Sequence, residues 1–336
     1  MSQSIIEFGK TPDNDAIQRV TLKGGGLKAN ILTYGATVQD LRLEGVAHPL
    51  VLGAPSIEPY FGPMKYFGAI VGRFANRIGQ GRFLLDGHAY NVSRNWLSRH
   101  TLHGGEVGAG EKIWSIEDLT DSSVTMGLEL ADGDMGFPGH LTVHAKITLT
   151  EDCSLGFDIR ATTTAATPCS FAHHGYFNLD GGPDITGHDL QIDAKAYLPV
   201  DDELIPTGEI RPVEGTKFDF RTRSEIGKRG LDHNFCLSDT RKPLRPVARL
   251  HSAESDLSMS VETTETGLQV YDAAYIPEAG LAGLDCQTYK PFAGVALETQ
   301  VWPDAPGRSE FPDAILRPEN EYRHQVRYVF TTGAQK

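Results

Sequence analysis

Two adjacent histidines near the middle of the chain, His173 and His174, are the residues best suited to proton transfer. They lie in the stretch 167–179, which reads TPCSFAHHGYFNL. Histidine titrates closest to neutral pH, so it is the usual proton donor or acceptor in catalysis. Successive side chains of an extended segment point to opposite faces, so one imidazole can face a pocket while the other packs inside. Two half-buried structural histidines are the simpler interpretation, unless the chain supplies partners for them.

A carboxylate that could serve as such a partner is Glu298, which interrupts an apolar run. Glutamate is almost never buried unpaired, so this one is either ion-paired or functional. Burial raises the pKa of a carboxyl group and makes it a candidate general base. Arg73 and Arg77, with Asn76 between them, interrupt a second apolar, glycine-rich stretch. Each arginine could form a buried ion pair or grip substrate hydroxyls, and the local sequence leaves both possibilities open.

Further polar residues stand beside apolar segments. His103 precedes two glycines, Asp232 opens an acid–base–amide run, and Gln269 and Tyr271 alternate with the apolar residues of a predicted strand. Taken singly, an exposed loop is the simpler interpretation of the first two. Together with the histidine and the glutamate above, these groups supply an acid, a base and hydrogen-bonding side chains. Such a set suits the movement of protons between the oxygens of a polyhydroxylated sugar.

Composition and charge exclude several classes of partner. The 336 residues carry a formal net charge of −13, which disfavours nucleic acid and anionic membranes because both require a basic face. The N-terminal sequence shows no secretory signal and no apolar run is long enough to span a bilayer, so we expect a cytoplasmic protein. The four cysteines are widely spaced without a CxxC pair, and no phosphate-binding loop is present. We therefore predict no metal, no disulfide and no cofactor.

Short strands separated by glycine and proline turns predict an all-β fold with few or no helices. Alternating apolar residues indicate a β-hairpin within 123–165 and a strand at 190–198. They also suggest a second hairpin at 257–275 and a final strand from 322 to 331. No break in composition divides the chain, so we expect one domain over 1–336 that forms a single large β-sandwich.

With these motifs in view, the sequence resembles the aldose 1-epimerase family, also called galactose mutarotases. The matching motifs follow the family's order and cover nearly the whole chain. They are GRFANRI at 72–78, LHGG at 102–105, TP at 167–168 with HGYFNL at 174–179, YLPV at 197–200 with IPTG at 205–208, LDHNF at 231–235, and LETQVWPD at 297–304. Any one of them is weak, but six in register are specific.

The resemblance implies a galactose-mutarotase-like β-sandwich of about thirty strands. It implies that Glu298 is the general base, His174 the general acid and His103 a second active-site histidine. Arg77 and Asp232 would hold sugar hydroxyls. The pattern of residues itself, rather than the resemblance, suggests Asn76, Gln269 and Tyr271 as supporting polar groups. The implied reaction needs no cofactor: the base removes the proton of the anomeric hydroxyl, the acid protonates the ring oxygen, and the opened ring recloses as the other anomer.

The chain departs from the family pattern at three places. It has His173-His174-Gly175 where the family usually has Asn-His-Ser, Ala109-Gly110 in place of Phe-Asp, and Asp272-Ala273-Ala274 in place of Thr-Gly-Asn. No proposed catalytic residue is replaced, but we expect the walls of the pocket to change. A pentose or a 6-deoxy sugar is therefore as credible a substrate as galactose or glucose.

Other functions remain open at this level. One is a non-catalytic sugar-binding or regulatory protein on the same fold. Another is an epimerase of sugar phosphates, which the acidic net charge disfavours. A glycosidase would need two carboxylates about 5 to 9 Å apart, such as Asp232 and Glu298. The sequence is compatible with a monomer or a homodimer.

Overall fold

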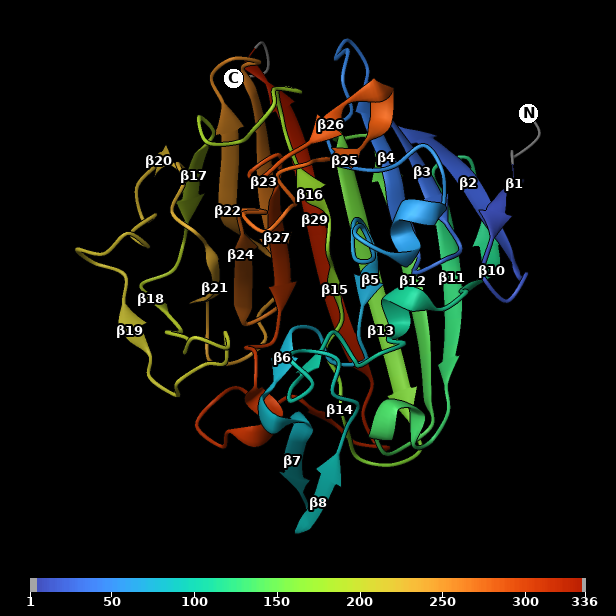
Figure 1. The fold of residues 1–336 in the computed structure, drawn as a ribbon, viewed down its shortest axis with the longest axis vertical. Helices are drawn as coiled ribbons and strands as arrows, with labels where there is room; N and C mark the ends of the chain where they lie inside the picture. The colour runs from blue at the N-terminus through green and yellow to red at the C-terminus, as the bar shows by residue number, and fades with distance from the viewer. Residues whose placement is uncertain (1–4, 334–336) are drawn as a thin grey trace.

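Antiparallel sheets account for nearly all the regular structure of residues 5–333, the part of the chain that the computed structural model describes (Figure 1). The largest sheet has nine strands. In spatial order they are β10 (Ser115–Leu119), β11 (Ser123–Leu130), β12 (Leu141–Thr150), β13 (Ser154–Thr163), β29 (Tyr322–Thr332), β23 (Leu257–Thr263), β22 (Arg245–Ser252), β17 (Asp189–Ile192) and β20 (Ser224–Glu225). The strand β29 thus lies in the middle of this sheet although it is the last element in sequence.

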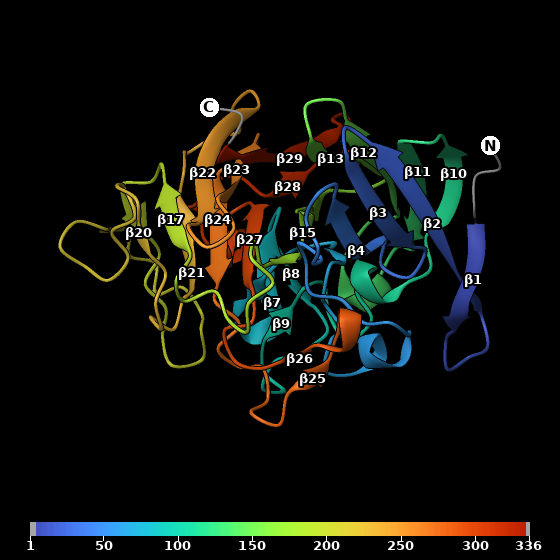
Figure 2. The same cartoon turned by 90° about the horizontal axis from the view of Figure 1, so that it is seen from above.

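Two smaller sheets make up the opposite layer. One holds β1 (Ile5–Lys10), β2 (Ala16–Gly24), β3 (Leu27–Leu32) and β4 (Thr37–Leu43). The other runs in the order β16 (Tyr176–Phe177), β27 (Val295–Gln300), β24 (Gly267–Tyr271), β21 (Asp232–Cys236), β18 (Ala196–Tyr197) and β19 (Arg211–Pro212). Seen from above, both face the nine-stranded sheet (Figure 2).

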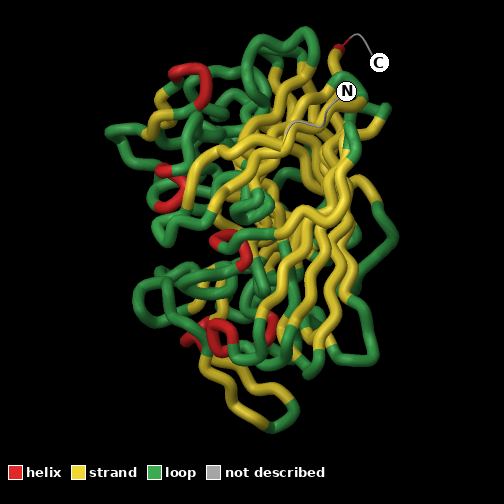
Figure 3. Tube along the Cα trace, turned by 90° about the vertical axis from the view of Figure 1, so that its right-hand side faces the viewer, coloured by secondary structure: helices red, strands yellow, loops and turns green. Residues whose placement is uncertain are grey.

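Short two-stranded ladders and single helical turns connect these layers. The ladders pair β5 (Ile70–Val71) with β15 (Ala172–His173), β6 (Arg77–Ile78) with β9 (Thr101–Leu102), β7 (Arg82–Leu85) with β8 (His88–Asn91), β14 (Thr167–Pro168) with β28 (Ile315–Leu316), and β25 (Leu281–Ala282) with β26 (Thr288–Tyr289). Six 3-10 turns lie at Glu58–Phe61, Gly79–Gly81, Ala109–Glu111, Asp134–Gly136, Leu284–Cys286 and Ala305–Gly307. They are the only helical segments of residues 5–333 (Figure 3), and no helix there is long and apolar enough to cross a bilayer.

The core lies between the two layers because the long strands alternate apolar and polar side chains. On β12, the buried positions are those of Leu141, Val143 and Ala145, while the residues between them are partly or fully exposed. Such a pattern gives each strand one face for the core and one for solvent. The predicted all-β sandwich and the hairpin within 123–165 are therefore confirmed.

Two of the expected strand arrangements are wrong. The segment 257–275 is not a hairpin: β23 joins the nine-stranded sheet, whereas β24 crosses to the six-stranded sheet. The segment 190–198 likewise divides into β17 in the first sheet and β18 in the second. In both cases the predicted alternation of buried and exposed side chains is correct. However, two strands that belong to different sheets bury the same residues as the two strands of a hairpin would. Periodicity therefore cannot distinguish the two arrangements.

Candidate active site

The six-stranded sheet places a row of polar side chains on one face. Glu298 of β27 is paired with Gln269 of β24, and in the next row Tyr271 is paired with Asp232 of β21. Paired residues, and residues two apart on one strand, share a face of a sheet. These four side chains therefore gather on the same face, and Gln269 donates a hydrogen bond of 2.5 Å from Nε2 to Oδ1 of Asp232.

The two adjacent histidines point to opposite sides, as the sequence predicts. The ring of His173 is buried in the core, where it stacks on Phe157 with centroids 4.5 Å apart and contacts the hydroxyl of Tyr328. His174 turns the other way and places its Nε2 3.5 Å from Oε1 of Glu298. The short pairing of β15 with β5 holds the segment in the extended conformation that this alternation requires.

The ladder between β6 and β9 brings a third group of residues to the same place. Arg77 is paired with Leu102, so His103 follows directly opposite Asn76. The main-chain N–H of Asn76 donates to Nδ1 of His103 at 3.1 Å, and the N–H of His103 donates to the carbonyl oxygen of Asn76 at 3.0 Å. Because Nδ1 accepts a hydrogen bond, the proton of the neutral imidazole lies on Nε2.

These elements surround one cavity of about 220 Å³. This volume is below the usual range for drug-sized ligands, roughly 300–1,000 Å³, and suits a ligand of one small ring. Its lining residues are Tyr66, Asn76, Arg77, Trp96, Leu102, His103, His174, Tyr176, Asp232, Tyr271, Tyr275 and Glu298. Seven of the eight predicted site residues are thus brought together, and the eighth, Gln269, lies behind Asp232 as its hydrogen-bond partner.

Arg77 is held in the cavity wall by two contacts. Its Nη2 lies 3.1 Å from Oδ2 of Asp232, and its guanidinium lies 4.7 Å from the ring centroid of Trp96. Two contacts of this kind fix both the position and the plane of the guanidinium group. The buried Nε of Arg77 and Oε2 of Glu298 have no hydrogen-bond partner among residues 5–333. Buried polar atoms are rarely left unpaired, so these two atoms are unusual for a protein interior.

Burial sets the protonation of Glu298 and His174. Glu298 is 2% exposed and His174 is 4% exposed. Burial, reinforced by the charge of Asp232 and opposed by that of Arg77, raises the pKa of Glu298 to about 8. Burial lowers the pKa of His174 to about 4. Between these values the pair therefore holds one proton, on the carboxyl group, and both side chains are neutral.

His103, His174 and Glu298 each offer one ligand atom, and these atoms lie within 4.8 Å of one another. Two features of the site disfavour a metal ion there. Nδ1 of His103 accepts a hydrogen bond from the main-chain N–H of Asn76. A metal ion bound to Nε2 would force the imidazole proton onto Nδ1, where it would clash with that N–H. The Arg77 guanidinium also brings a positive charge to the same cavity. The absence of a metal thus stays a prediction, with this tautomer as its physical support.

The two arginines left open by the sequence have different roles. Arg77 lines the cavity, whereas Arg73 is buried behind it. The guanidinium of Arg73 donates to the carbonyl oxygens of Leu130, Ala131, Pro138 and Gly139 and to the hydroxyl of Thr167. Its partners are therefore four main-chain carbonyls and one hydroxyl rather than a carboxylate, and Arg73 does not line the cavity. Both alternatives, a buried ion pair and a grip on substrate hydroxyls, are thus wrong for Arg73.

The family departures do not form the pocket walls, contrary to the expectation. The cavity lining includes neither His173 nor Gly175, and Ala109, Gly110 and 272–274 are absent from it as well. Asp272 lies one layer behind, where its carboxylate accepts the N–H of Leu231 at 2.7 Å. It thereby supports the residue that precedes Asp232.

Aromatic residues of the cavity were missed by the sequence reasoning. Tyr66, Trp96, Tyr176 and Tyr275 all line it. The rings of Tyr66 and Tyr176 contact that of His174, with centroids 5.9 and 5.0 Å apart. Tyr176 lies within the recognised motif at 174–179, which is a usable signal, whereas Tyr66 lies six residues before the motif at 72–78. Nothing in the local sequence distinguishes Trp96 or the exposed Tyr275 from ordinary loop residues.

Comparison with known proteins agrees with this geometry. The family model described as aldose 1-epimerase matches residues 18–329. The chain belongs to the aldose 1-epimerase family. It is therefore a mutarotase, an isomerase that interconverts the α and β anomers of an aldose. This confirms the family resemblance, and with it the class of enzyme that the sequence predicted.

Relatives of known name and one solved structure match this chain over nearly their whole length. The chain is 39% identical to galactose mutarotase of Rattus norvegicus, with 97% of this chain and 98% of the relative covered. It is 34% identical to aldose 1-epimerase of Escherichia coli, with 95% and 96% covered. The crystal structure of galactose 1-epimerase from Lactobacillus acidophilus superimposes with a TM-score of 0.86 at 26% identity, with 99% of both chains covered.

Proposed function

We propose that the protein interconverts the anomers of free galactose, with Glu298 as general base and His174 as general acid. The observation that carries this assignment is the pair itself, whose Oε1 and Nε2 atoms lie 3.5 Å apart at a small cavity. The anomeric hydroxyl oxygen and the ring oxygen of a pyranose are bonded to the same carbon. An acid and a base that act on them must therefore lie close together, as these two do.

In the forward reaction, Glu298 removes the proton of the anomeric hydroxyl while His174 protonates the ring oxygen. The bond between C1 and the ring oxygen breaks, and the sugar opens to its aldehyde. Rotation about the C1–C2 bond presents the other face of the carbonyl group. Glu298 then returns its proton to the carbonyl oxygen as the ring hydroxyl attacks C1 and gives its proton to His174.

The electrostatics of the cavity support this sequence. When the ring is open, the pair consists of a carboxylic acid and a neutral imidazole. Burial favours the same arrangement in the free site, where the pKa of Glu298 is raised to about 8 and that of His174 is lowered to about 4. The surroundings thus stabilise the state that accompanies the open-chain intermediate. The proton moves to His174 when the bound sugar donates hydroxyl hydrogen bonds to the carboxylate.

The remaining site residues have positioning roles in this proposal. Arg77 and Asp232 hold sugar hydroxyls, and their ion pair fixes the direction of each. His103 presents Nε2–H as a neutral donor, since burial lowers its pKa well below the usual range. Gln269 orients Asp232. Galactose is proposed as the substrate because the mammalian relatives are galactose mutarotases at 37–39% identity over nearly the whole chain.

Polarimetry on freshly dissolved α-D-galactose tests the proposal. The protein should accelerate the approach to the equilibrium rotation, and the isosteric variant Glu298→Gln should not. Glucose, xylose, arabinose and fucose measured in parallel rank the substrates. Faster turnover of a pentose or of fucose than of galactose would refute galactose as the preferred sugar. Near-normal activity in the Glu298→Gln variant would refute the assignment of the base.

We also propose that the chain acts as one domain in the cytoplasm, as a monomer or a homodimer. One buried hydrophobic cluster extends from Val20 to Phe330, which supports a single folding unit. The four cysteines are free, as expected for a reducing compartment. Sedimentation equilibrium of the purified protein would distinguish the two assembly states.

A further inference from the structure

The acid and the base of the site lie on two strands that separate beside the cavity. The ladder between β16 and β27 pairs Phe177 with Val295 and Tyr176 with Ala296, and it ends there. Residues 172–173 pair with β5 instead. His174 and Glu298 each lie two residues beyond the last pair, Tyr176 and Ala296. At that point the ladder no longer determines the distance between the two segments. The main chain of His174 is bound to Ala69 and Gly68, and Glu298 is paired with Gln269, so each residue is anchored to a different neighbour. A contact that joins the two segments directly would fix their separation.

His324 of β29 makes such a contact from the opposite sheet. Its side chain is completely buried, and its Nδ1 lies 3.0 Å from the carbonyl oxygen of Phe171, three residues before His174. Its Nε2 lies 2.9 Å from the hydroxyl of Thr299, the residue after Glu298. One imidazole therefore connects the segment that carries the acid to the strand that carries the base.

The hydrogen bonds of His324 select one tautomer. A carbonyl oxygen can only accept, so Nδ1 carries the proton and donates it to Phe171. Nε2 then accepts from the hydroxyl of Thr299 at 2.9 Å, and the hydroxyl of Thr263 on β23 lies 3.3 Å from the same atom. Burial lowers the pKa of His324, which keeps the ring neutral in this arrangement. Both nitrogens are thus satisfied without any part in proton transfer.

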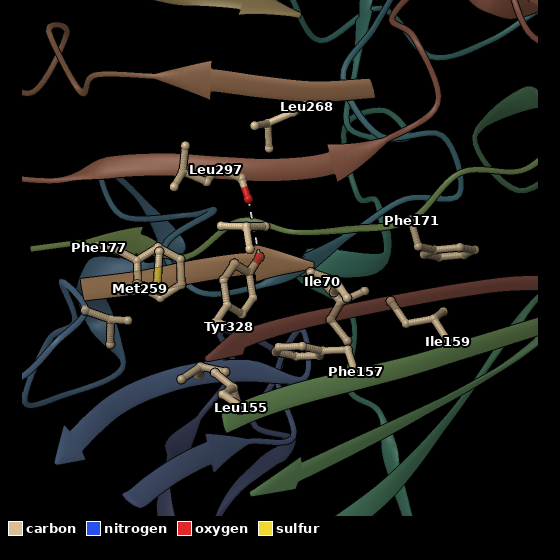
Figure 4. Close-up of a cluster of buried hydrophobic side chains, with 14 of the residues drawn as sticks. Ile70, Leu155, Phe157, Ile159, Phe171, Phe177, Met259, Leu268, Leu297 and Tyr328 are labelled. Atoms are coloured by element: carbon tan, nitrogen blue, oxygen red, sulfur yellow. Dashed lines mark hydrogen bonds between the residues drawn. The ribbon is translucent and has the colours of Figure 1, made fainter. Parts of the chain in front are cut away.

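Other side chains of β29 reinforce the same two segments. The hydroxyl of Tyr322 accepts the N–H of Phe171 at 3.0 Å, so both main-chain polar groups of Phe171 are bound by this strand. The hydroxyl of Tyr328 donates to the carbonyl oxygen of Leu297, the residue before Glu298, at 3.3 Å (Figure 4). Residues 322, 324 and 328 lie on the inward face of β29, which its alternation directs to the core.

We propose that His324 is a positioning residue that fixes the separation between His174 and Glu298. The inference rests on the proposed roles of those two residues. It predicts a specific kinetic signature, because Arg77 and Asp232 lie on β6 and β21, whereas the hydrogen bonds of His324 within residues 5–333 go to Phe171, Thr299 and Thr263. Loss of the bridge should therefore lower kcat and leave KM unchanged.

The decisive experiment compares two isosteric variants. Thr299→Val removes the hydroxyl that joins Nε2 to the strand of the base, and Thr263→Val removes the other hydroxyl near the same atom. Both threonines are buried, but β23 carries no site residue. Because a small displacement of reacting groups can cost up to about 10²-fold in rate, we expect Thr299→Val to lower kcat for galactose about tenfold. Thr263→Val should lower the melting temperature and change kcat less than about twofold.

Variants of the imidazole complete the test. His324→Asn keeps an N–H for Phe171 but cannot reach Thr299, whereas His324→Leu loses both contacts. We expect kcat to fall further in the Leu variant than in the Asn variant. The double variant Thr299→Val/His324→Asn should match His324→Asn alone, because both changes remove the same contact. If the Leu variant does not fold, the two threonine variants still decide the question.

A readout that does not depend on turnover separates this inference from the proposed function. The side-chain carboxyl NMR signal of Glu298 should shift, and titrate at a different pH, in Thr299→Val but not in Thr263→Val. Equal kcat in the two threonine variants, together with an unchanged Glu298 signal, would overturn the positioning role. A wild-type protein without mutarotase activity would instead refute the proposed function, while the NMR comparison would still test the bridge.

Discussion

Replacing Glu298 by glutamine should stabilise the protein, and the gain should grow with pH. The pKa of this carboxyl group is about 8 in the folded protein against an ordinary value of 4.5. Between these values the folded state binds more protons than the unfolded state, so the free energy of unfolding falls as the pH rises. The slope is about 1.4 kcal/mol per pH unit, and it ends once the folded carboxyl group has ionised.

The raised pKa of Glu298 lowers the free energy of unfolding of the wild-type protein by about 5 kcal/mol at pH 9 and by less than about 1 kcal/mol at pH 5. Glutamine has the same shape and does not ionise, so the variant is not destabilised in this way at either pH. The pH dependence of groups remote from Glu298 is common to both proteins and cancels in the difference, and His174, whose pKa is lowered to about 4, stays neutral over this pH range. The variant should therefore be more stable than the wild type at pH 9 and nearly equal to it at pH 5.

Urea unfolding of both proteins at pH 5 and pH 9 measures this difference, and polarimetry on the same samples measures activity. We expect a variant that is inactive at both pH values and clearly more stable only at the higher one. A stability difference at pH 9 no larger than that at pH 5 would show that the carboxyl group ionises normally in the folded protein. The desolvation argument for Glu298 would then be refuted.

Three further predictions follow from the contacts of individual residues. The kcat/KM for galactose should be bell-shaped in pH with limbs near 4 and 8, since Glu298 and His174 need one shared proton, and a flat profile from pH 5 to 9 would contradict this. Gly175→Ser should lower stability by about 1–3 kcal/mol in urea unfolding, because a Cβ there would overlap Cε1 of His173, and adding His173→Asn should restore it. Arg73→Lys should lower the melting temperature by removing hydrogen bonds to main-chain carbonyls while KM stays the same; a raised KM would place Arg73 in the site.

The alternation of side chains made much of the site predictable. An extended segment must direct His173 and His174 to opposite sides. A glutamate in an apolar strand is expected to be either ion-paired or functional. Both arguments depend only on neighbours in sequence. The resemblance to the family indicated which of the two histidines faces the cavity, and the structure places His174 there. The resemblance could do so because the motifs preserve the order of the strands.

Other parts of the site depend on contacts that no local pattern records. Arg73 and Arg77 have nearly the same sequence surroundings, and only the tertiary structure shows that one meets main-chain carbonyls and the other meets Asp232. His324 occupies an ordinary inward position of a predicted strand, and its partners are 25 and 153 residues away along the chain. For the same reason, the sequence could not show that the chain passes from one sheet to the other between β23 and β24.

The central place of β29 in the nine-stranded sheet has a consequence for how the protein is made. Its neighbour β13 leaves the ribosome about 160 residues earlier, which at roughly 5–20 residues per second is a delay of about 10 to 30 s. During that time β13 has an open edge of hydrogen-bonding groups, which is prone to pairing with other chains. The sheet therefore closes late in synthesis, and the interval before β29 emerges is when a nascent chain would most need a chaperone.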